Sequence, residues 1–169
     1  EKQVGKGIEK AIQDNLCKRE DLHVTSKLWN TYHHYDHVEQ ACMKTLNDLN
    51  LDYLDLYLIH FPISLEYVSL DDKYPPEWTN SEGKMVLVKQ DLLQTWKGLE
   101  KLYKKKLVKQ IGVSNYNSVL LRQLINTAEI PPSAIQIELH PYLSQKKMVK
   151  LSKSYGLEIS GFSPLGAKS

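Results

Sequence analysis

The feature that most constrains the fold is a regular alternation of helical and extended patterns along the whole chain. Apolar residues recur at helical spacing from Val4 to Ile12, and an extended run at 22–26 follows. Further helical patterns cover 38–49, 92–102, 118–125 and 144–151, and further extended runs cover 53–59, 110–113, 135–139 and 157–162. The alternation predicts parallel strands joined by helical crossovers, and hence an α/β fold with about five helices and five strands.

Several residues mark the expected helix ends. Asp36, with Glu39 three residues later, matches a capping box at the start of the second helix. Ser118 and Ser144 are the N-caps that we expect for the last two helices. Gly156 follows the last helix, where a left-handed residue commonly ends a helix.

Composition excludes several other classes of protein. The chain has 169 residues, of which 41% are hydrophobic, so we expect one globular domain or part of one. Lys+Arg 22 against Asp+Glu 20 gives a net charge of +2, which does not favour a nucleic-acid partner. The basic run 104–106 ends a helical pattern, where cations favour the helix dipole. No apolar run approaches the ~18 residues of a membrane-spanning helix.

Cysteine and histidine usage gives two further expectations. Cys17 and Cys42 allow at most one disulfide, and no signal-peptide pattern opens the chain, so we expect a cytoplasmic protein. His33, His34 and His37 lie close together without a matching Cys or carboxylate pattern, so we expect no metal site there.

Polar residues follow several of the expected strands at the point where each strand ends. Parallel strands bring these ends to one face, which is where (β/α)8 barrels place their active sites. The residues concerned are Ser26, Lys27, His60, Ser114, Asn115, Glu138, His140 and Ser163. A doubly wound sheet is the alternative, but neither a Gly-x-Gly-x-x-Gly turn nor a phosphate-loop lysine motif is present, so we favour the barrel. The aperiodic stretch from Pro62 to Lys89 is long enough to be a functional loop.

Lys27 and His60 are the two strand-end residues with the clearest chemistry. A half-buried lysine lowers the pKa of a nearby phenol or amine by its charge, and a neutral imidazole donates a hydrogen bond to a carbonyl. Position alone leaves two structural alternatives open: a lysine that extends into water, and a histidine satisfied within the core.

Five segments, in order, resemble the aldo-keto reductase family and together span nearly the whole chain. The segments are 25–29 (Thr-Ser-Lys-Leu-Trp), 54–62 (ending Ile-His-Phe-Pro), 109–116 (containing Gly-Val-Ser-Asn), 136–142 (containing Glu-Leu-His-Pro) and 162–166 (Phe-Ser-Pro-Leu-Gly). Tyr32-His33, Phe61 and the run 73–76 are most similar to the aldose and xylose reductases of that family.

The resemblance implies a (β/α)8 barrel that binds NADPH, with NADH as the other possibility, and transfers hydride to an aldehyde or ketone. It implies that Lys27 lowers the pKa of a proton-donating tyrosine and that His60 positions the carbonyl oxygen. Trp29, His60 and Phe61 are expected to line the substrate pocket. The residues expected to bind the cofactor are Ser114, Asn115, Gln136, Phe162, Ser163 and Leu165.

The sequence also departs from the family pattern at its start, where two catalytic residues of the family are expected. In the family the tyrosine and an aspartate lie before the Val-Gly that corresponds to Val4-Gly5, so both are expected upstream of Glu1, and Tyr32, Tyr35 and Tyr57 match neither. We therefore expect 1–169 to be a central part of one barrel domain that is by itself inactive and poorly stable.

Two other functions stay open. One is a nucleotide-binding regulatory or structural subunit of the same fold, and the other is a barrel enzyme of unrelated chemistry. The exact substrate and the oligomeric state are not predicted.

Overall fold

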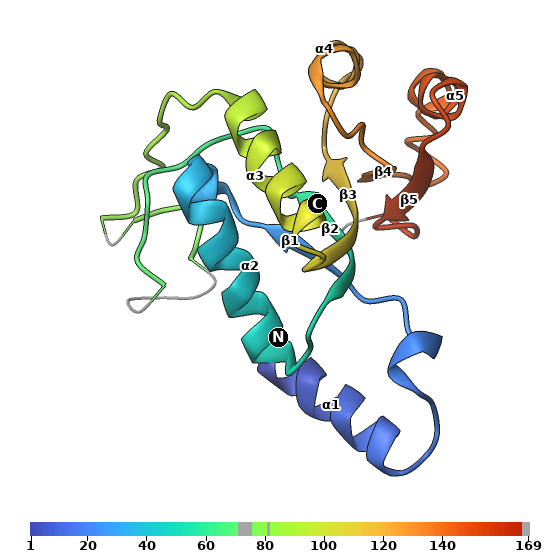
Figure 1. Cartoon of the computed structure of the whole chain (residues 1–169). Helices are drawn as coiled ribbons and strands as arrows, with labels where there is room; N and C mark the ends of the chain where they lie inside the picture. The colour runs from blue at the N-terminus through green and yellow to red at the C-terminus, as the bar shows by residue number, and fades with distance from the viewer. Residues whose placement is uncertain (71–75, 81, 167–169) are drawn as a thin grey trace.

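A computed structural model describes residues 1–70, 76–80 and 82–166. In this part the chain forms five α-helices and five strands in strict alternation, which confirms the predicted α/β class (Figure 1). The helices are α1 (Lys2–Gln13), α2 (Tyr35–Leu49), α3 (Leu92–Lys104), α4 (Ser118–Thr127) and α5 (Lys146–Ser154). The strands are β1 (Thr25–Leu28), β2 (Leu54–Ile59), β3 (Val108–Ser114), β4 (Ala134–Glu138) and β5 (Glu158–Phe162). Two short 3-10 turns, η1 (Arg19–Asp21) and η2 (Asn30–Tyr32), flank β1.

The strands form one parallel sheet in the order β1-β2-β3-β4-β5, so every strand lies beside its neighbour in sequence. Lys27 pairs with Leu58, Ile59 with Val113, and Ser114 with Gln136. Because all the strands run the same way, their carboxyl ends lie along one edge. Within the described residues β1 and β5 each pair with a single strand, and they form the two sides of the sheet.

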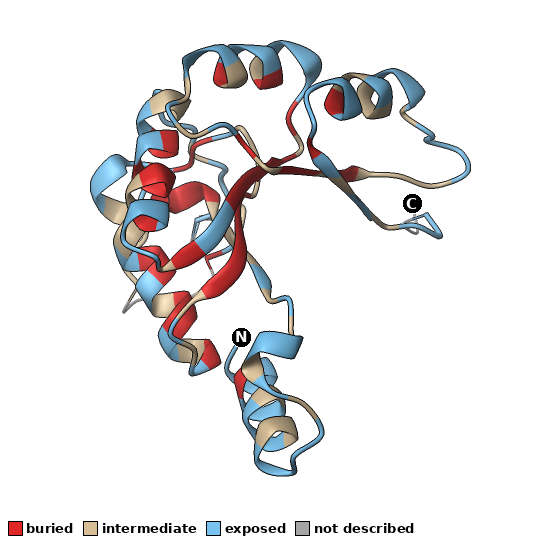
Figure 2. Cartoon of the chain, turned by 45° about the vertical axis from the view of Figure 1, so that its right-hand side comes forward, coloured by how far each residue is buried: buried red, intermediate tan, exposed pale blue. Residues whose placement is uncertain are grey.

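Most of the core lies between the sheet and the helices. Trp96, Leu99 and Leu102 of α3 are fully buried against the outward-facing side chains of β2 and β3, and α2 adds a similar apolar stripe. Figure 2 shows buried residues concentrated in the central strands and on the sheet-facing sides of the helices. The opposite face of the sheet has a small separate cluster of Leu56, Leu58 and Ala134.

Gly112 allows close packing on that inner face. A Cβ atom added to Gly112 would lie 2.5 Å from the carbonyl oxygen of Ala134 and 2.7 Å from Leu58 Cδ2. Since the first of these neighbours is backbone, it has little freedom to move away, and only glycine fits between β2 and β4 at this point.

The first strand begins later than predicted, at Thr25 rather than Leu22. The polar groups before it are used in other contacts: Arg19 donates to the Leu22 carbonyl, and the Val24 amide donates to the Asp55 carboxylate. The strand also continues one residue past Lys27, to Leu28, so Lys27 lies inside it.

Three predicted helix caps are wrong by one or two residues. The N-cap of α2 is His34, whose side chain accepts from the Asp36 amide, and Glu39 instead pairs with Lys101 and Lys105. Asn117, not Ser118, caps α4, and Gln145, not Ser144, precedes α5. The left-handed conformation predicted for Gly156 is confirmed by its φ of 74°.

The connection from β2 to α3 is a long loop, as predicted, and its two sides are joined near their bases. Leu65 and Leu87 form an antiparallel bridge, and the Val88 amide donates to the Ser64 carbonyl. The Leu65 amide also donates to the Asn30 carbonyl of η2, and His33 Nδ1 lies 2.8 Å from Ser64 Oγ. Residues 73–75 of the run that is most similar to aldose and xylose reductases lie outside the described residues.

In the described part of the chain no helix has the length and apolar character needed to cross a membrane.

Asp55 should make a large contribution to stability. Its carboxylate accepts from the Val24 amide at 2.9 Å, from Arg19 at 2.9 Å and from Lys109 at 3.0 Å. Burial alone raises its pKa, but these donors outweigh burial and hold the pKa below its ordinary value. We expect Asp55→Asn to lower the free energy of unfolding by about 2 kcal/mol at neutral pH, because charged donors are left poorly paired. Urea denaturation of the complete protein measures the change.

The pH dependence of this loss follows from the sign of the shift. A carboxyl whose pKa is lower in the folded state stabilises the protein above its unfolded pKa of about 3.9, and that stabilisation disappears as pH falls through the folded pKa. The difference between wild type and Asp55→Asn should therefore shrink below about pH 4. Asp52→Asn, at an exposed position nearby, is the control and should change stability little. Equal losses in the two variants would contradict the role of Asp55.

Candidate active site

The predicted site residues form a row along the carboxyl edge of the sheet. Lys27 is near the end of β1, His60 directly follows β2, Ser114 ends β3 and Phe162 ends β5. Gln136 lies inside β4, beside Ser114. The structure therefore brings together residues that are far apart in sequence.

Lys27 lies on the inner face of the sheet, since it pairs with Leu58 of the inner cluster. It is half-buried, and burial lowers the pKa of its ammonium group. Among the described residues Lys27 has no hydrogen-bond or ion-pair partner. Its charge is thus available to act on a group that comes close to the ammonium.

A cavity of about 670 Å³ lies at Lys27. Lys27, Trp29 and His60 line it together with the first turn of α1. The other lining residues are Thr25, Ser26, Lys44, Asp48 and Pro76. The hydroxyl of Ser26 donates to Glu1 Oε1 at 2.6 Å, which fixes the start of α1 against β1. The described lining contains no tyrosine.

His60 lies beside Lys27 and is neutral at physiological pH. Burial, reinforced by the charge of Lys27, lowers its pKa to about 4. Its backbone amide donates to the Leu28 carbonyl at 3.1 Å, so the end of β2 is held against the end of β1. A neutral imidazole has one N–H to donate and can bind a carbonyl oxygen without delivering a full charge.

The rings of Trp29, Phe61 and Trp78 form an aromatic wall around His60. The Trp29 ring is 5.0 Å from that of His60, and His60 stacks on Phe61 at 4.9 Å. Trp78 contacts both Trp29 and Phe61 edge-on, each at 5.0 Å. Sequence reasoning missed Trp78, because it comes from the aperiodic β2–α3 loop, where spacing gives no indication of what a side chain contacts.

Ser114, Asn115 and Gln136 form a connected polar group beside His60. Ser114 is buried, and Asn115 Nδ2 donates to Ser114 Oγ at 3.1 Å and to the His60 carbonyl at 2.9 Å. The Asn115 amide donates to the Gln136 carbonyl at 2.9 Å. The side-chain oxygen of Asn115 has no protein partner in the described residues, so an amide N–H of a ligand can bind to it. The side chain of Gln136 itself donates to Ser160 Oγ at 3.3 Å.

The last predicted group lies at and after β5. Phe162 pairs with Glu138 and is partly buried. Ser163 adopts a left-handed conformation with φ of 49°, and Leu165 is 97% exposed. The turn at 163–166 thus presents backbone and hydroxyl groups at the same edge as Lys27 and His60, although no described contact links it to them.

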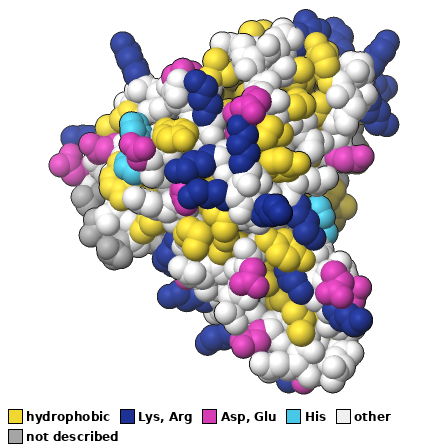
Figure 3. Space-filling model, viewed as in Figure 1, with side chains coloured by type: hydrophobic (Ala, Val, Ile, Leu, Met, Phe, Trp, Pro, Cys, Tyr) yellow, Lys and Arg dark blue, Asp and Glu magenta, His cyan; other side chains and the backbone are white. Residues whose placement is uncertain are grey.

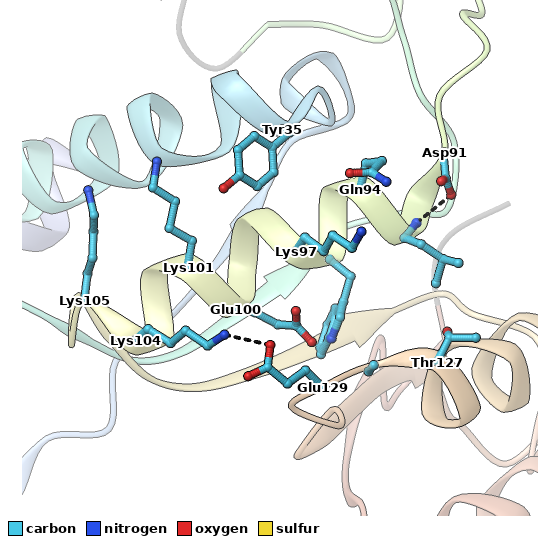
Figure 4. A pocket seen from close by; sticks show the side chains of 13 residues that line it. Tyr35, Asp91, Gln94, Lys97, Glu100, Lys101, Lys104, Lys105, Thr127 and Glu129 are labelled. Carbon is cyan, nitrogen blue, oxygen red and sulfur yellow. Dashed lines mark hydrogen bonds and ion pairs between the residues drawn. The ribbon is translucent and has the colours of Figure 1, made fainter.

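A second cavity, of about 770 Å³, lies on the helix side between α2, α3 and the end of α4 (Figure 4). Lys97, Lys101, Lys104 and Lys105 line it. Lys104 pairs with Glu129, whereas Lys101 and Lys105 both pair with Glu39. Figure 3 shows acidic side chains among the lysines on this face. Residues 104–106 are all exposed, which confirms the predicted solvated character of this basic run.

The three clustered histidines do not converge on one point. His33 is buried and contacts Ser64, whereas His37 packs against the Tyr67 ring at 4.0 Å. Over the residues that the structure describes, no group of three His, Cys, Asp or Glu side chains is arranged to hold a metal ion.

Comparison with known proteins gives consistent matches. A family model described as "Aldo/keto reductase family" matches residues 1–168. The NAD(P)H-dependent D-xylose reductase of Pachysolen tannophilus is 48% identical over 167 residues, which cover 98% of this chain and 52% of that protein. The NADH-dependent D-xylose reductase of Candida parapsilosis is 47% identical over 170 residues, covering 100% of this chain and 52% of that protein.

Among solved structures, the aldose reductase of Schistosoma japonicum superposes with a TM-score of 0.89 at 39% identity, covering 97% of this chain and 53% of that one. This likeness confirms the predicted fold, a partial (β/α)8 barrel. The chain spans about half the length of the curated relatives it matches.

The electrostatic effect of Lys27 on His60 gives a spectroscopic prediction. Removing the cation in Lys27→Met should raise the pKa of His60 above the wild-type value of about 4, while burial keeps it below the ordinary value. NMR titration of the histidine ring protons measures both values. Lys97→Met, on the exposed side of α3, is the control, and a His60 pKa that is the same in all three proteins would refute the coupling.

Proposed function

Because the chain belongs to the aldo/keto reductase family, we propose that it supplies the central part of an enzyme that reduces aldehydes or ketones with a nicotinamide cofactor. The observation that carries the proposal is that Lys27 and a neutral His60 line the same cavity at the carboxyl edge of the sheet. A cation and a neutral hydrogen-bond donor side by side suit a reaction in which a carbonyl oxygen gains a proton.

Lys27 is proposed to stabilise the phenolate form of a tyrosine that donates this proton. The described lining has no tyrosine, and we propose that residues before Glu1 provide it. The start of α1 lines the Lys27 cavity, so a residue that directly precedes it would enter the cavity near the ammonium group. A nearby cation lowers a phenol's pKa because it favours the anion left after proton transfer.

His60 is proposed to orient the substrate. Its neutral imidazole donates an N–H to the carbonyl oxygen, and the aromatic wall of Trp29, Phe61 and Trp78 excludes water from one side. Two names among the relatives, both D-xylose reductases, support an aldose sugar as the substrate class. The polar groups at the cavity and the aromatic wall together suit a polyol chain with a terminal aldehyde.

The cofactor is proposed to be NADPH, with NADH also accepted, as the names of the relatives indicate. When bound, it supplies the hydride. Ser114, Asn115 and Gln136 would hold its carboxamide, Phe162 would stack on its ring, and Ser163 and Leu165 would contact the pyrophosphate region. These residues lie along one edge, as a ligand extended across the sheet requires.

We propose that residues 1–169 lie within a single barrel domain, consistent with the coverage of the relatives. We place the protein in the cytoplasm, where its two free cysteines, Cys17 and Cys42, would stay reduced.

Lys27→Met in the complete protein should lower kcat at least about 100-fold, the range expected when proton transfer loses its assistance. Initial rates of NADPH oxidation with a saturating aldose measure this effect. Lys44→Met is a demanding control, since Lys44 lines the same cavity but its ammonium is paired with Asp48. Near-normal turnover in Lys27→Met would remove Lys27 from the mechanism.

The isolated 169-residue chain should not oxidise NADPH in the presence of an aldose, because no described residue of the cavity replaces the tyrosine. The complete protein, assayed in parallel, should do so. Carbonyl-dependent turnover by the isolated chain would contradict the proposed proton donor. Cofactor binding without turnover by the complete protein would favour the alternative of a non-catalytic nucleotide-binding subunit.

A further inference from the structure

One residue, Asn115, joins three neighbouring strands at the edge that carries the site, through its side chain and its backbone. Asn115 Nδ2 donates to the His60 carbonyl at 2.9 Å and to Ser114 Oγ at 3.1 Å. A carbonyl oxygen only accepts hydrogen bonds, so this contact fixes which end of the amide points toward His60. The Asn115 backbone amide meanwhile donates to the Gln136 carbonyl of β4.

The hydrogen bond from Asn115 Nδ2 to the His60 carbonyl takes the place of a backbone hydrogen bond between β2 and β3. The pairing of β2 with β3 ends at Ile59 and Val113, so the His60 carbonyl lies just past the ladder. Asn115 turns away from β2 with a left-handed φ of 61°, and its backbone N–H goes to β4. Its side chain supplies the missing donor to the end of β2.

The backbone of His60 is thus held from both sides. Its N–H donates to the Leu28 carbonyl of β1, and its C=O accepts from Asn115. The ring is held between Trp29 and Phe61. Among the described residues, the Asn115 side chain provides the hydrogen bond that holds the His60 carbonyl toward β3.

We propose that Asn115 is a positioning residue for His60, in addition to its proposed contact with the cofactor. The inference rests on the proposed function, in which His60 orients the carbonyl. Displacement of a reacting group by about 1 Å is enough to cost about 100-fold in rate, so a backbone restraint on His60 acts directly on turnover.

The residue type at 115 meets two demands at once. Asparagine tolerates the left-handed conformation, and its amide provides the donor. Glycine tolerates the left-handed conformation but has no side-chain donor. Aspartate keeps the shape of the side chain but places a carboxylate oxygen, which cannot donate, next to the His60 carbonyl oxygen and Ser114 Oγ. Both substitutions therefore remove the hydrogen bond and leave the backbone turn in place.

The first experiment compares Asn115→Gly and Asn115→Asp with wild type in the complete protein at saturating NADPH. We expect kcat/KM for the aldose to fall at least about tenfold in both variants. Asn117→Asp makes the same chemical change two residues away, at an exposed N-cap where aspartate also caps, and should keep wild-type rates. Rates in the two Asn115 variants that match those of Asn117→Asp would overturn the proposal.

A double-mutant cycle separates positioning from cofactor binding. His60→Ala keeps the backbone carbonyl but removes the ring whose position matters. If part of the effect of Asn115 acts through His60, Asn115→Gly should lower kcat/KM by a clearly smaller factor in the His60→Ala background than in wild type, and the remaining loss reports the contact with the cofactor. The same loss in both backgrounds would show that Asn115 acts through the cofactor alone.

An NMR measurement that does not depend on enzyme activity tests this inference separately from the proposed function. The rings of Trp29 and Phe61 shift the NMR signals of the His60 ring protons, so these signals report the position of the imidazole. They should move in both Asn115 variants but not in Asn117→Asp. Unmoved signals would overturn the positioning role even in an active enzyme, whereas moved signals in a protein that reduces no carbonyl would support that role and reject the reductase proposal.

Discussion

The carboxylate of Asp55 aligns the strands on which the site depends. It accepts from the amide of Val24, just before β1, and from Lys109 of β3, while Arg19 and Lys109 also lie over the Tyr53 ring. These contacts fix β1 and β3 against β2 at their first residues. A shift by one residue would turn every side chain to the other face, and Lys27 would then point into the helix layer. The juxtaposition of Lys27 and His60 at the far end is therefore set by register at the near end.

Periodicity predicted much of this arrangement from sequence alone. The order of the ten elements, the parallel class and the polar strand ends all follow from patterns that extend over many residues, so errors at single positions do not matter. Helix caps were predicted less well, because neighbouring polar residues compete for the same amides. At the start of α4, Asn117 and Ser118 are both acceptable cap residues, and only the backbone conformation decides for Asn117.

The parts of the site that sequence missed depend on contacts between distant segments. Trp78 belongs to a loop without a period, and its packing against Trp29 and Phe61 follows from how that loop folds back. The bond from Asn115 to the His60 carbonyl depends on a single left-handed residue and on where a strand ladder stops. A family motif identifies such a residue without showing which of its atoms face which partner.

The β2–α3 loop is joined at its base by the Leu65–Leu87 bridge and is held to η2 by the Asn30 carbonyl and by His33. The segment past this bridge contributes Trp78 to the aromatic wall, whereas Lys27 lies on β1 and His60 directly after β2, both before the bridge in sequence. Insertions or substitutions past the bridge thus reshape the wall while the strand register stays as it is. The shape of the aromatic wall can therefore change independently of the positions of Lys27 and His60.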